Sequence, residues 1–184
     1  MFIIKFFPLF INFAYLFKRI SSMLIPFHDL DPGSKVWIFQ AENVLTESQT
    51  TAIKELLLEF LQDWTAHNAQ LYTSGDVLHH RFIVIMVDER YQGASGCSLD
   101  KMTHFVQYME HKFGITLLER MTVAYESPTS GEIVTAPLSH LGDLSKAGVI
   151  QPETIVYNNL VKTKTEFEQC WKTKIMDSWH NRFI

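Results

Sequence analysis

Residues 81–101 read RFIVIMVDERYQGASGCSLDK, an apolar run followed by a loop of small residues. The run holds Phe82 to Met86 without interruption, and Val87 extends it. Its short length and its β-branched side chains are typical of a strand that is buried on both faces. We therefore expect a buried strand over Arg81 to Val87.

A helix is expected after the loop. Apolar residues recur at spacings of three and four between Leu99 and Phe113, which predicts one face packed in the core from about Ser98 onward. Gly114 is well placed to end this helix as its C-cap. Ser98 is expected to be the N-cap, with Asp100 in the first turn.

Local patterns predict further elements on both sides of this region. Thr46 and Gln49 form a capping box, and an apolar stripe of helical spacing follows them. Other expected elements are strands at 35–40, 71–74 and 153–161, a turn at 74–76, a hairpin at 121–135, a helix from Pro137 to Lys146, and a final helix with Thr165 and Glu168 as capping box and Phe167, Trp171 and Ile175 on one face. The expected fold class is α/β or α+β, one domain with a mixed β-sheet packed by about four helices.

Composition limits the classes of partner. The chain has 184 residues, 47% of them hydrophobic and 20% charged, which suits a single domain with a buried core. A formal net charge of −4 provides no general attraction to nucleic acid or anionic lipid. Small-molecule or protein partners are therefore expected, and nucleic acid is not. The lysines of residues 160–184 are interpreted as a solvated helix face.

Residues 1–22 form the most hydrophobic stretch of the chain. Lys5, Pro8 and Asn12 interrupt it, so it is a poor spanning helix, and it lacks the charge order and cleavage site of a signal peptide. We interpret it as an upstream extension of the reading frame, with translation beginning at Met23 and one globular domain over 23–184. A membrane anchor is the weaker alternative, so membrane contact is expected only if residues 1–22 belong to the protein.

Two cysteines, Cys97 and Cys170, exclude a disulfide framework and fit a cytoplasmic location. The eight histidines contain no His-Glu-x-x-His pattern. No metal site is therefore expected, and the cofactor, if there is one, stays unknown.

The loop after the apolar run is the candidate ligand site. Amides at the start of a helix converge and favour negative charge, so this corner suits a phosphate or a carboxylate. It has neither a P-loop nor a dinucleotide-binding motif, so the indication is its position alone. The candidate ligand-binding residues are Asp88, Arg90, Ser95, Gly96, Ser98, Lys101 and Asn158.

Cys97 is the candidate nucleophile, because a helix dipole stabilises a thiolate in the first turn. A base would have to come from distant residues: His79, His80, His140 or His180. The alternative is that Cys97 is a small buried residue at a helix start. Two further alternatives stay open. Asp88 and Glu89 either bind Mg²⁺ or form a charged strand end. Asn158 and Asn159 either contact a ligand or form a turn.

A set of segments from the whole of residues 23–184 resembles a small uncharacterised protein family of Bacteroidota that is often labelled "ABC transporter ATPase". The segments are SKVWIFQA, RFIVIMVDER, GASGCSLDK, TIVYNNLV and DSWHNRF. The resemblance implies no particular activity. The ATPase label conflicts with the sequence, which has no Gly-Lys dipeptide and no Leu-Ser-Gly-Gly-Gln type signature.

Three functions remain open from the sequence. The first is a cytoplasmic domain, not an ABC-type ATPase, that binds a small anionic ligand or a protein at residues 88–101. The second is a thiol-dependent enzyme that uses Cys97. The third is a non-catalytic interaction module whose contact surface contains exposed aromatic residues such as Trp37, Trp64 or Trp179.

Overall fold

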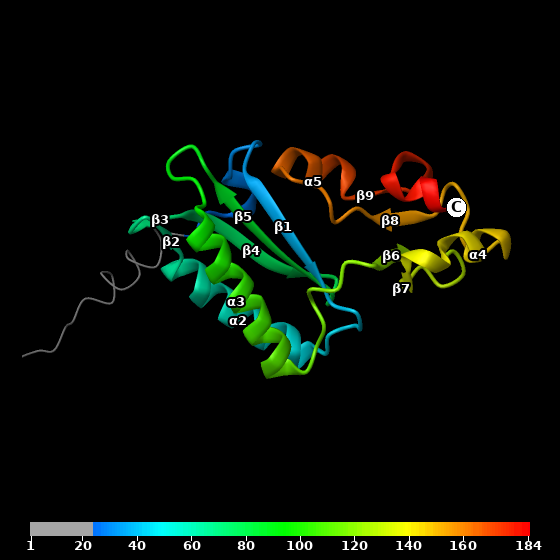
Figure 1. Cartoon of the computed structure of the whole chain (residues 1–184), viewed down its shortest axis with the longest axis horizontal. Coiled ribbons are helices and arrows are strands. Elements are labelled where there is room, and N and C mark those ends of the chain that lie inside the picture. Colours follow the sequence, from blue (N-terminus) through cyan, green and yellow to red (C-terminus); the bar gives the residue numbers. More distant parts are fainter. Residues whose placement is uncertain (1–23) are drawn as a thin grey trace, which may run out of the picture.

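The computed structural model describes residues 24–184, and its centre is a three-stranded antiparallel sheet (Figure 1). The strand order is β1 (Lys35–Gln40), β5 (Phe82–Asp88), β4 (Tyr72–Leu78). All seven residues of the middle strand β5 are buried. The expected strand buried on both faces is therefore confirmed, since each face of the sheet is covered by a separate core cluster.

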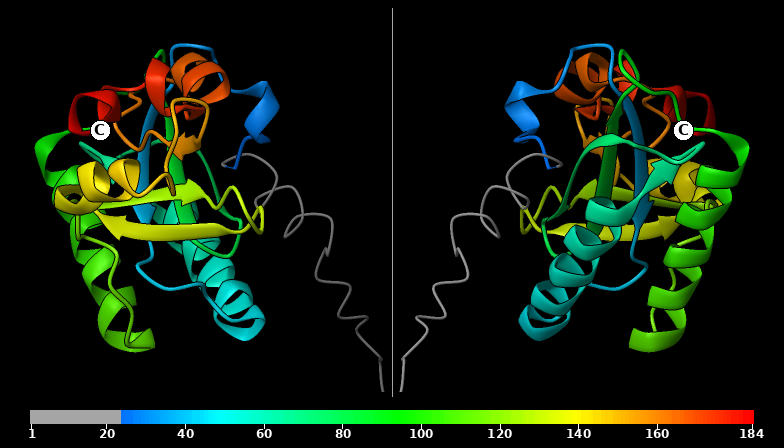
Figure 2. Two further views of the ribbon diagram at one scale, coloured as in Figure 1. Left: turned by 90° about the vertical axis from the view of Figure 1, so that its right-hand side faces the viewer. Right: turned by 90° about the vertical axis from the view of Figure 1, so that its left-hand side faces the viewer.

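Helices α2 (Glu47–Asp63) and α3 (Gly96–Phe113) cover one face of this sheet, and both views in Figure 2 place them on the same side. They pack against Ile83, Ile85 and Val87, the alternate residues of β5. The capping box of Thr46 and Gln49 at the start of α2 is confirmed, as is Gly114 at the end of α3, where it adopts φ 62°. The small hairpin of β2 (Thr65–Ala66) and β3 (Ala69–Gln70) follows α2.

Gly75 corrects one prediction of the sequence analysis. We expected a turn at 74–76, but β4 runs through these residues to Leu78. A Cβ on Gly75 would lie 2.7 Å from Leu61 Cδ1 and 3.0 Å from the main-chain oxygen of Val84. The glycine therefore lets α2 approach the sheet closely, and it marks packing between elements instead of a turn.

A second antiparallel sheet lies beyond β1, with strand order β7 (Ile133–Pro137), β6 (Thr122–Glu126), β8 (Ile155–Tyr157), β9 (Lys172–Lys174) (Figure 1). The hairpin expected at 121–135 is β6 and β7. Two short helices, α4 (Leu141–Lys146) and α5 (Lys164–Cys170), accompany this sheet. Four 3-10 turns complete the described chain: η1 (Phe27–Asp29), η2 (Leu138–His140), η3 (Ile175–Asp177) and η4 (Trp179–Phe183).

The second face of the central sheet packs against residues of the second half of the chain. Phe82, Val84 and Met86 contact a cluster that includes Tyr157 and Trp171. Phe82 stacks on Tyr157 with ring centroids 4.8 Å apart. The two sheets therefore share a core instead of forming independent units.

Arg81 joins the two sheets through main-chain carbonyl groups. Its guanidinium donates to the oxygens of Ala41 and Glu42 at 3.0 and 2.7 Å, and to that of Ile133 in β7 at 3.4 Å. Burial lowers the pKa of this arginine. The residue that begins the apolar run is thus a cross-link between β1, the β4–β5 turn and β7.

The fold class and the four α-helices of the described residues agree with the sequence analysis, in one compact α+β domain. The prediction of a single mixed sheet was wrong, because the strands form three sheets and pair antiparallel in each. The expected strand at 153–161 is only three residues long. No helix within residues 24–184 is long and apolar enough to cross a membrane. The interpretation of residues 1–22 lies outside the described residues.

The C-terminal region also differs from its prediction. Helix α5 begins after Thr163, whose side chain accepts from the amide of Glu166, two residues before the expected capping box of Thr165 and Glu168. The helix ends at Cys170, and Ile175 lies in η3. The chain leaves the helix because Lys172–Lys174 pair with β8 as strand β9.

Candidate functional site

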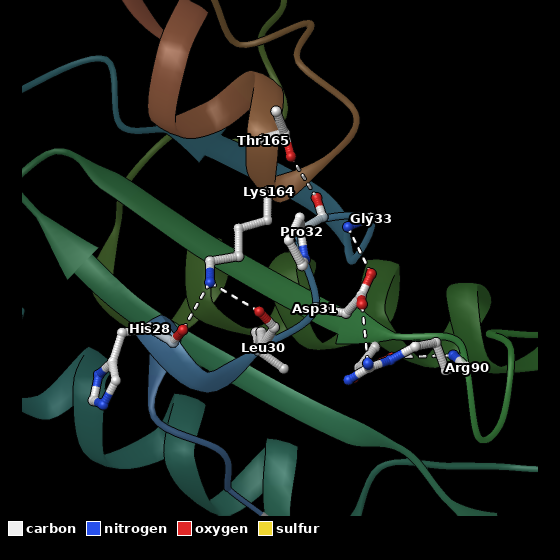
Figure 3. Close-up of polar contacts among 9 residues, drawn as sticks. His28, Leu30, Asp31, Pro32, Gly33, Arg90, Lys164 and Thr165 are labelled. Carbon is white, nitrogen blue, oxygen red and sulfur yellow. Dashed lines mark hydrogen bonds and ion pairs between the residues drawn. The ribbon is translucent and has the colours of Figure 1, made fainter.

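The corner, defined as residues 88–101, carries most of the candidate ligand residues. Asp88 is 1% exposed and accepts three charged hydrogen bonds from Arg90. Nε donates to Oδ1 at 3.0 Å and to Oδ2 at 3.2 Å, and Nη2 donates to Oδ2 at 2.6 Å. Arg90 Nη1 also pairs with Asp31 Oδ2 at 2.9 Å, which Figure 3 shows. The bond from Arg90 holds the pKa of Asp88 below its usual range, although burial opposes this shift. Arg90 is therefore already shared by two carboxylates.

The neighbouring charges of the corner are paired as well. Lys35 Nζ lies 2.8 Å from Glu89 Oε2, and the amide of Ala94 donates to Glu89 Oε1 at 3.0 Å. Asp88 and Glu89 therefore bind residues of the chain itself, as expected for a charged strand end.

Ser95, not Ser98, is the N-cap of α3. The Ser95 hydroxyl accepts from the amide of Ser98 at 3.3 Å, and Ser98 Oγ accepts from the amide of Ser95 at 2.7 Å. Ser98 is buried, and its main-chain oxygen accepts from Trp64 Nε1 at 2.9 Å. The prediction for the cap was wrong by three residues, because Ser95-x-x-Ser98 is a reciprocal box that a search for Glu or Gln at its last position overlooks.

Cys97 is exposed, so the interpretation as a small buried residue was wrong. The Nδ1 atoms of His80 and His180 bond to Thr50 Oγ1 and Ser178 Oγ, and within residues 24–184 no hydrogen bond joins a histidine to the thiol. Cys97 as a nucleophile stays a prediction. If Cys97 is alkylated no faster than Cys170, the prediction that Cys97 is a nucleophile is wrong.

The other candidate residues do not converge on one point. Lys101 lines a hollow between α2 and α3. Nothing lies within 4 Å of a Cβ built on Gly96, so this glycine is not needed for a close approach within the chain. Asn158 follows β8 in the second sheet, where its Oδ1 accepts from Trp179 Nε1 at 2.9 Å.

Lys164 shows that the basic C-terminal stretch is not simply a solvated face. It is 5% exposed, and its Nζ donates to the main-chain oxygens of His28 and Leu30 at 2.9 and 2.8 Å (Figure 3). Thr165 Oγ1 donates to the oxygen of Pro32 at 3.0 Å. The start of α5 therefore holds residues 28–32, and Asp31 of that segment reaches Arg90 in the corner.

A cleft between β1 and the second sheet is lined by charged side chains that have no ion-pair partner within the described residues. Its volume is about 400 Å³, which lies within the ~300–1,000 Å³ of small-molecule sites. We call it the inter-sheet cleft. Its lining comes from four segments: Val36–Gln40, Leu117–Val123, Tyr157–Lys162, and Trp179 with His180. No single segment carries a motif for this cleft, so it could not be predicted from the sequence.

Arg120 and Lys162 contribute two cations to the inter-sheet cleft, and Glu119 contributes one anion. Both cations are exposed, and neither forms an ion pair with another residue of the range 24–184. They contrast with Arg90 of the corner and with Lys35 beside it, which carboxylates already neutralise. An anion that enters the cleft meets unpaired positive charge beside apolar walls such as Leu117 and Trp37.

His180 is a second unusual group of the cleft. It is 2% exposed, its Nδ1 lies 2.7 Å from Ser178 Oγ, and its ring stacks on Trp179 at 3.9 Å. Burial, with a smaller contribution from Arg182, lowers the pKa of His180 to about 4. The imidazole is neutral at pH 7, and its Nε2 has no hydrogen-bond partner within the described residues.

Amide side chains fix the inner end of the cleft. Asn159 Nδ2 donates to Gln40 Oε1 at 2.8 Å, and Asn159 Oδ1 accepts from Trp171 Nε1 at 3.0 Å. Gln40 Nε2 in turn donates to the main-chain oxygen of Thr122 at 3.2 Å. Asn159 and Gln40 therefore hold β1 against the second sheet. Trp37 and Trp179 are partly exposed here, whereas Trp64 is buried and offers no contact surface.

A wider hollow of about 730 Å³ surrounds Arg81, but there two carboxylates, Glu42 and Glu132, outnumber the single arginine. In the inter-sheet cleft, two cations outnumber the single carboxylate of Glu119. Within residues 24–184 there is no group of three or more His, Cys, Asp or Glu residues placed to hold a metal ion. The inter-sheet cleft is therefore the candidate site that the geometry favours.

Comparison with known proteins adds no family assignment: no family model, curated protein or solved structure matches the chain. The resemblance to the Bacteroidota family therefore stays a prediction.

Proposed function

We propose that this protein binds a small organic anion with an apolar body in the inter-sheet cleft, and that it does so in the cytoplasm. The observation that carries the proposal is the pair Arg120 and Lys162, two exposed cations without an ion-pair partner in the described chain beside an apolar cleft. Two free, exposed cysteines fit a reducing compartment. Anion binding at the corner is the less favoured location, because Arg90 and the adjacent Lys35 already serve Asp31, Asp88 and Glu89. Within residues 24–184 this leaves Lys101 as the one cation of the corner without an ion pair, and Lys101 lines a separate hollow.

Anilinonaphthalene sulfonate is a suitable probe, since it joins an aromatic body to one negative charge. We expect it to bind the Arg120→Ala/Lys162→Ala variant about tenfold or more weakly than the wild-type protein. The variant loses ~1.5 kcal/mol or more of charge-assisted contact with the sulfonate. Titration followed by fluorescence and by calorimetry measures this difference.

Lys146→Ala/Lys174→Ala is the matched control, because both lysines are exposed and neither lines the cleft. Equal affinity of all three proteins for the probe would overturn the proposal. Native mass spectrometry of the chain purified from its own organism gives a second reading: a retained ligand should be lost from the cleft variant and kept by the control variant.

A further inference from the structure

The outer edge of β1 faces the inter-sheet cleft. The sheet order places β1 at an edge, with only β5 beside it over most of its length. The amide of Ala41 donates to Arg81 next to β5, whereas the amide of Val36 donates outward to Lys162 at 3.0 Å. Since main-chain groups alternate along a strand, the amides and carbonyls of Val36, Ile38 and Gln40 point to the outer edge.

The chain itself pairs with only the first part of this edge. Lys35 and Thr163 form an isolated antiparallel bridge, and Lys162 accepts from Val36. If this register continued, Leu160 would lie opposite Ile38. Instead the chain turns away, because the amide of Leu160 bonds to Asn158 Oδ1 at 3.2 Å and that of Val161 to the main-chain oxygen of Asn158 at 3.4 Å.

The remaining edge is therefore unpaired inside the cleft. Within residues 24–184 the amides of Ile38 and Gln40 have no hydrogen-bond partner, and both residues line the cleft. An open strand edge in a pocket is a template for an added strand, in which main-chain bonds provide affinity and nearby side chains provide specificity.

Direction and charge point to one kind of peptide. A strand that continues the row begun by Thr163 and Lys162 runs antiparallel to β1, so its C-terminal end lies toward Val36 and next to Lys162. Lys162 is one of the two unpaired cations of the cleft. The Lys162 amide already donates to Glu166 Oε2 at 2.7 Å, so the group left open there is the Lys162 ammonium. A free C-terminal carboxylate would form a charge-assisted contact with that ammonium.

We propose that the anion bound in the inter-sheet cleft is the C-terminus of an extended peptide, whose last residues add to β1 at Ile38 and Gln40 with the carboxylate beside Lys162. This inference rests on the proposed function and deepens it by naming the class of ligand. The free peptide backbone supplies the complementary donors and acceptors, and the apolar walls of the cleft receive its side chains.

Amide hydrogen exchange by NMR tests the proposal at single residues. The probe is a mixture of N-acetylated tripeptides with free C-terminal carboxylates, added to the full chain. We expect exchange of the Ile38 and Gln40 amides to slow at least tenfold, while exchange at Trp37 and Phe39, whose amides face β5, changes little. The same tripeptides with amidated C-termini are the matched control and should bind at least tenfold more weakly.

Four results would overturn the inference. If the tripeptides bind without slowing exchange at Ile38 and Gln40, the edge is not the site. If the naphthalene probe depends on Arg120 and Lys162 but no tripeptide binds, the anion-binding function stands and the peptide does not. Protection of both amides that appears without peptide and grows with protein concentration would identify a second copy of the chain as the occupant. Failure of both probes would remove the proposed function together with the inference.

Discussion

The corner and the inter-sheet cleft both bring charged side chains to the end of a strand, but they differ in what those side chains bind. At the corner, Arg90 joins Asp88 to Asp31 and the adjacent Lys35 joins Glu89, so both of these cations have a carboxylate of the chain itself. In the cleft, Arg120 and Lys162 have none within the described residues. Bonds within the chain favour stability, whereas polar groups left without partners favour a ligand.

The largest expected effect is an acid sensitivity that comes from the cleft. The pKa of His180 falls to about 4 in the folded protein from about 6.5, so its contribution is fully present above pH 6.5 and is lost as the pH falls toward 4. The shift corresponds to about 3 kcal/mol of unfolding free energy across this window. Urea unfolding between pH 7 and 4 should show it.

His180→Gln should flatten this part of the pH profile, whereas His140→Gln, at an exposed position, should leave it unchanged. An equal pH slope in the wild type and His180→Gln would show that the imidazole is not held neutral by burial.

The next effect concerns the corner. Asp88→Asn should lower the unfolding free energy by about 2 kcal/mol at pH 7, because the buried acceptor of Arg90 loses its charge. The pKa of Asp88 is depressed in the folded state, so the difference should be fully present above about pH 4, the pKa of the unfolded chain. It should be lost progressively as the pH falls from there through the lowered pKa of the folded state. Chemical denaturation at pH 7 and pH 2.5 measures both parts.

Arg120→Ala/Lys162→Ala provides the contrast and should change the unfolding free energy by less than about 0.5 kcal/mol. If that variant were as destabilised as Asp88→Asn, the division between a structural corner and a binding cleft would be wrong.

The smallest effect is the cap of α3. Ser95→Ala should cost about 1 kcal/mol of unfolding free energy, because the Ser98 amide loses its acceptor. Cys97→Ser, at an exposed position two residues later, should be neutral within about 0.5 kcal/mol. Thermal unfolding of both variants and the wild type measures these differences. An unchanged unfolding free energy in Ser95→Ala would contradict the assigned cap.

Local patterns predicted the elements whose causes lie within a few residues. The apolar run at 82–87, the capping box of Thr46 and the C-cap at Gly114 are all confirmed. Predictions that needed a distant partner were wrong. Gly75 is a contact between α2 and β4, and the final helix stops at Cys170 because residues 172–174 pair with β8.

The same distinction holds for the candidate sites. Sequence patterns were sufficient to find a strand followed by a polar loop and a helix, because hydrophobic periodicity and helix signals act over one element. They could not tell that Arg90 is shared by two carboxylates, or that Arg120 and Lys162 line one cleft, since those facts depend on which distant segments meet. Tertiary structure decides which polar groups are satisfied within the chain and which remain open to a partner, because hydrogen bonds and ion pairs form between neighbours in space.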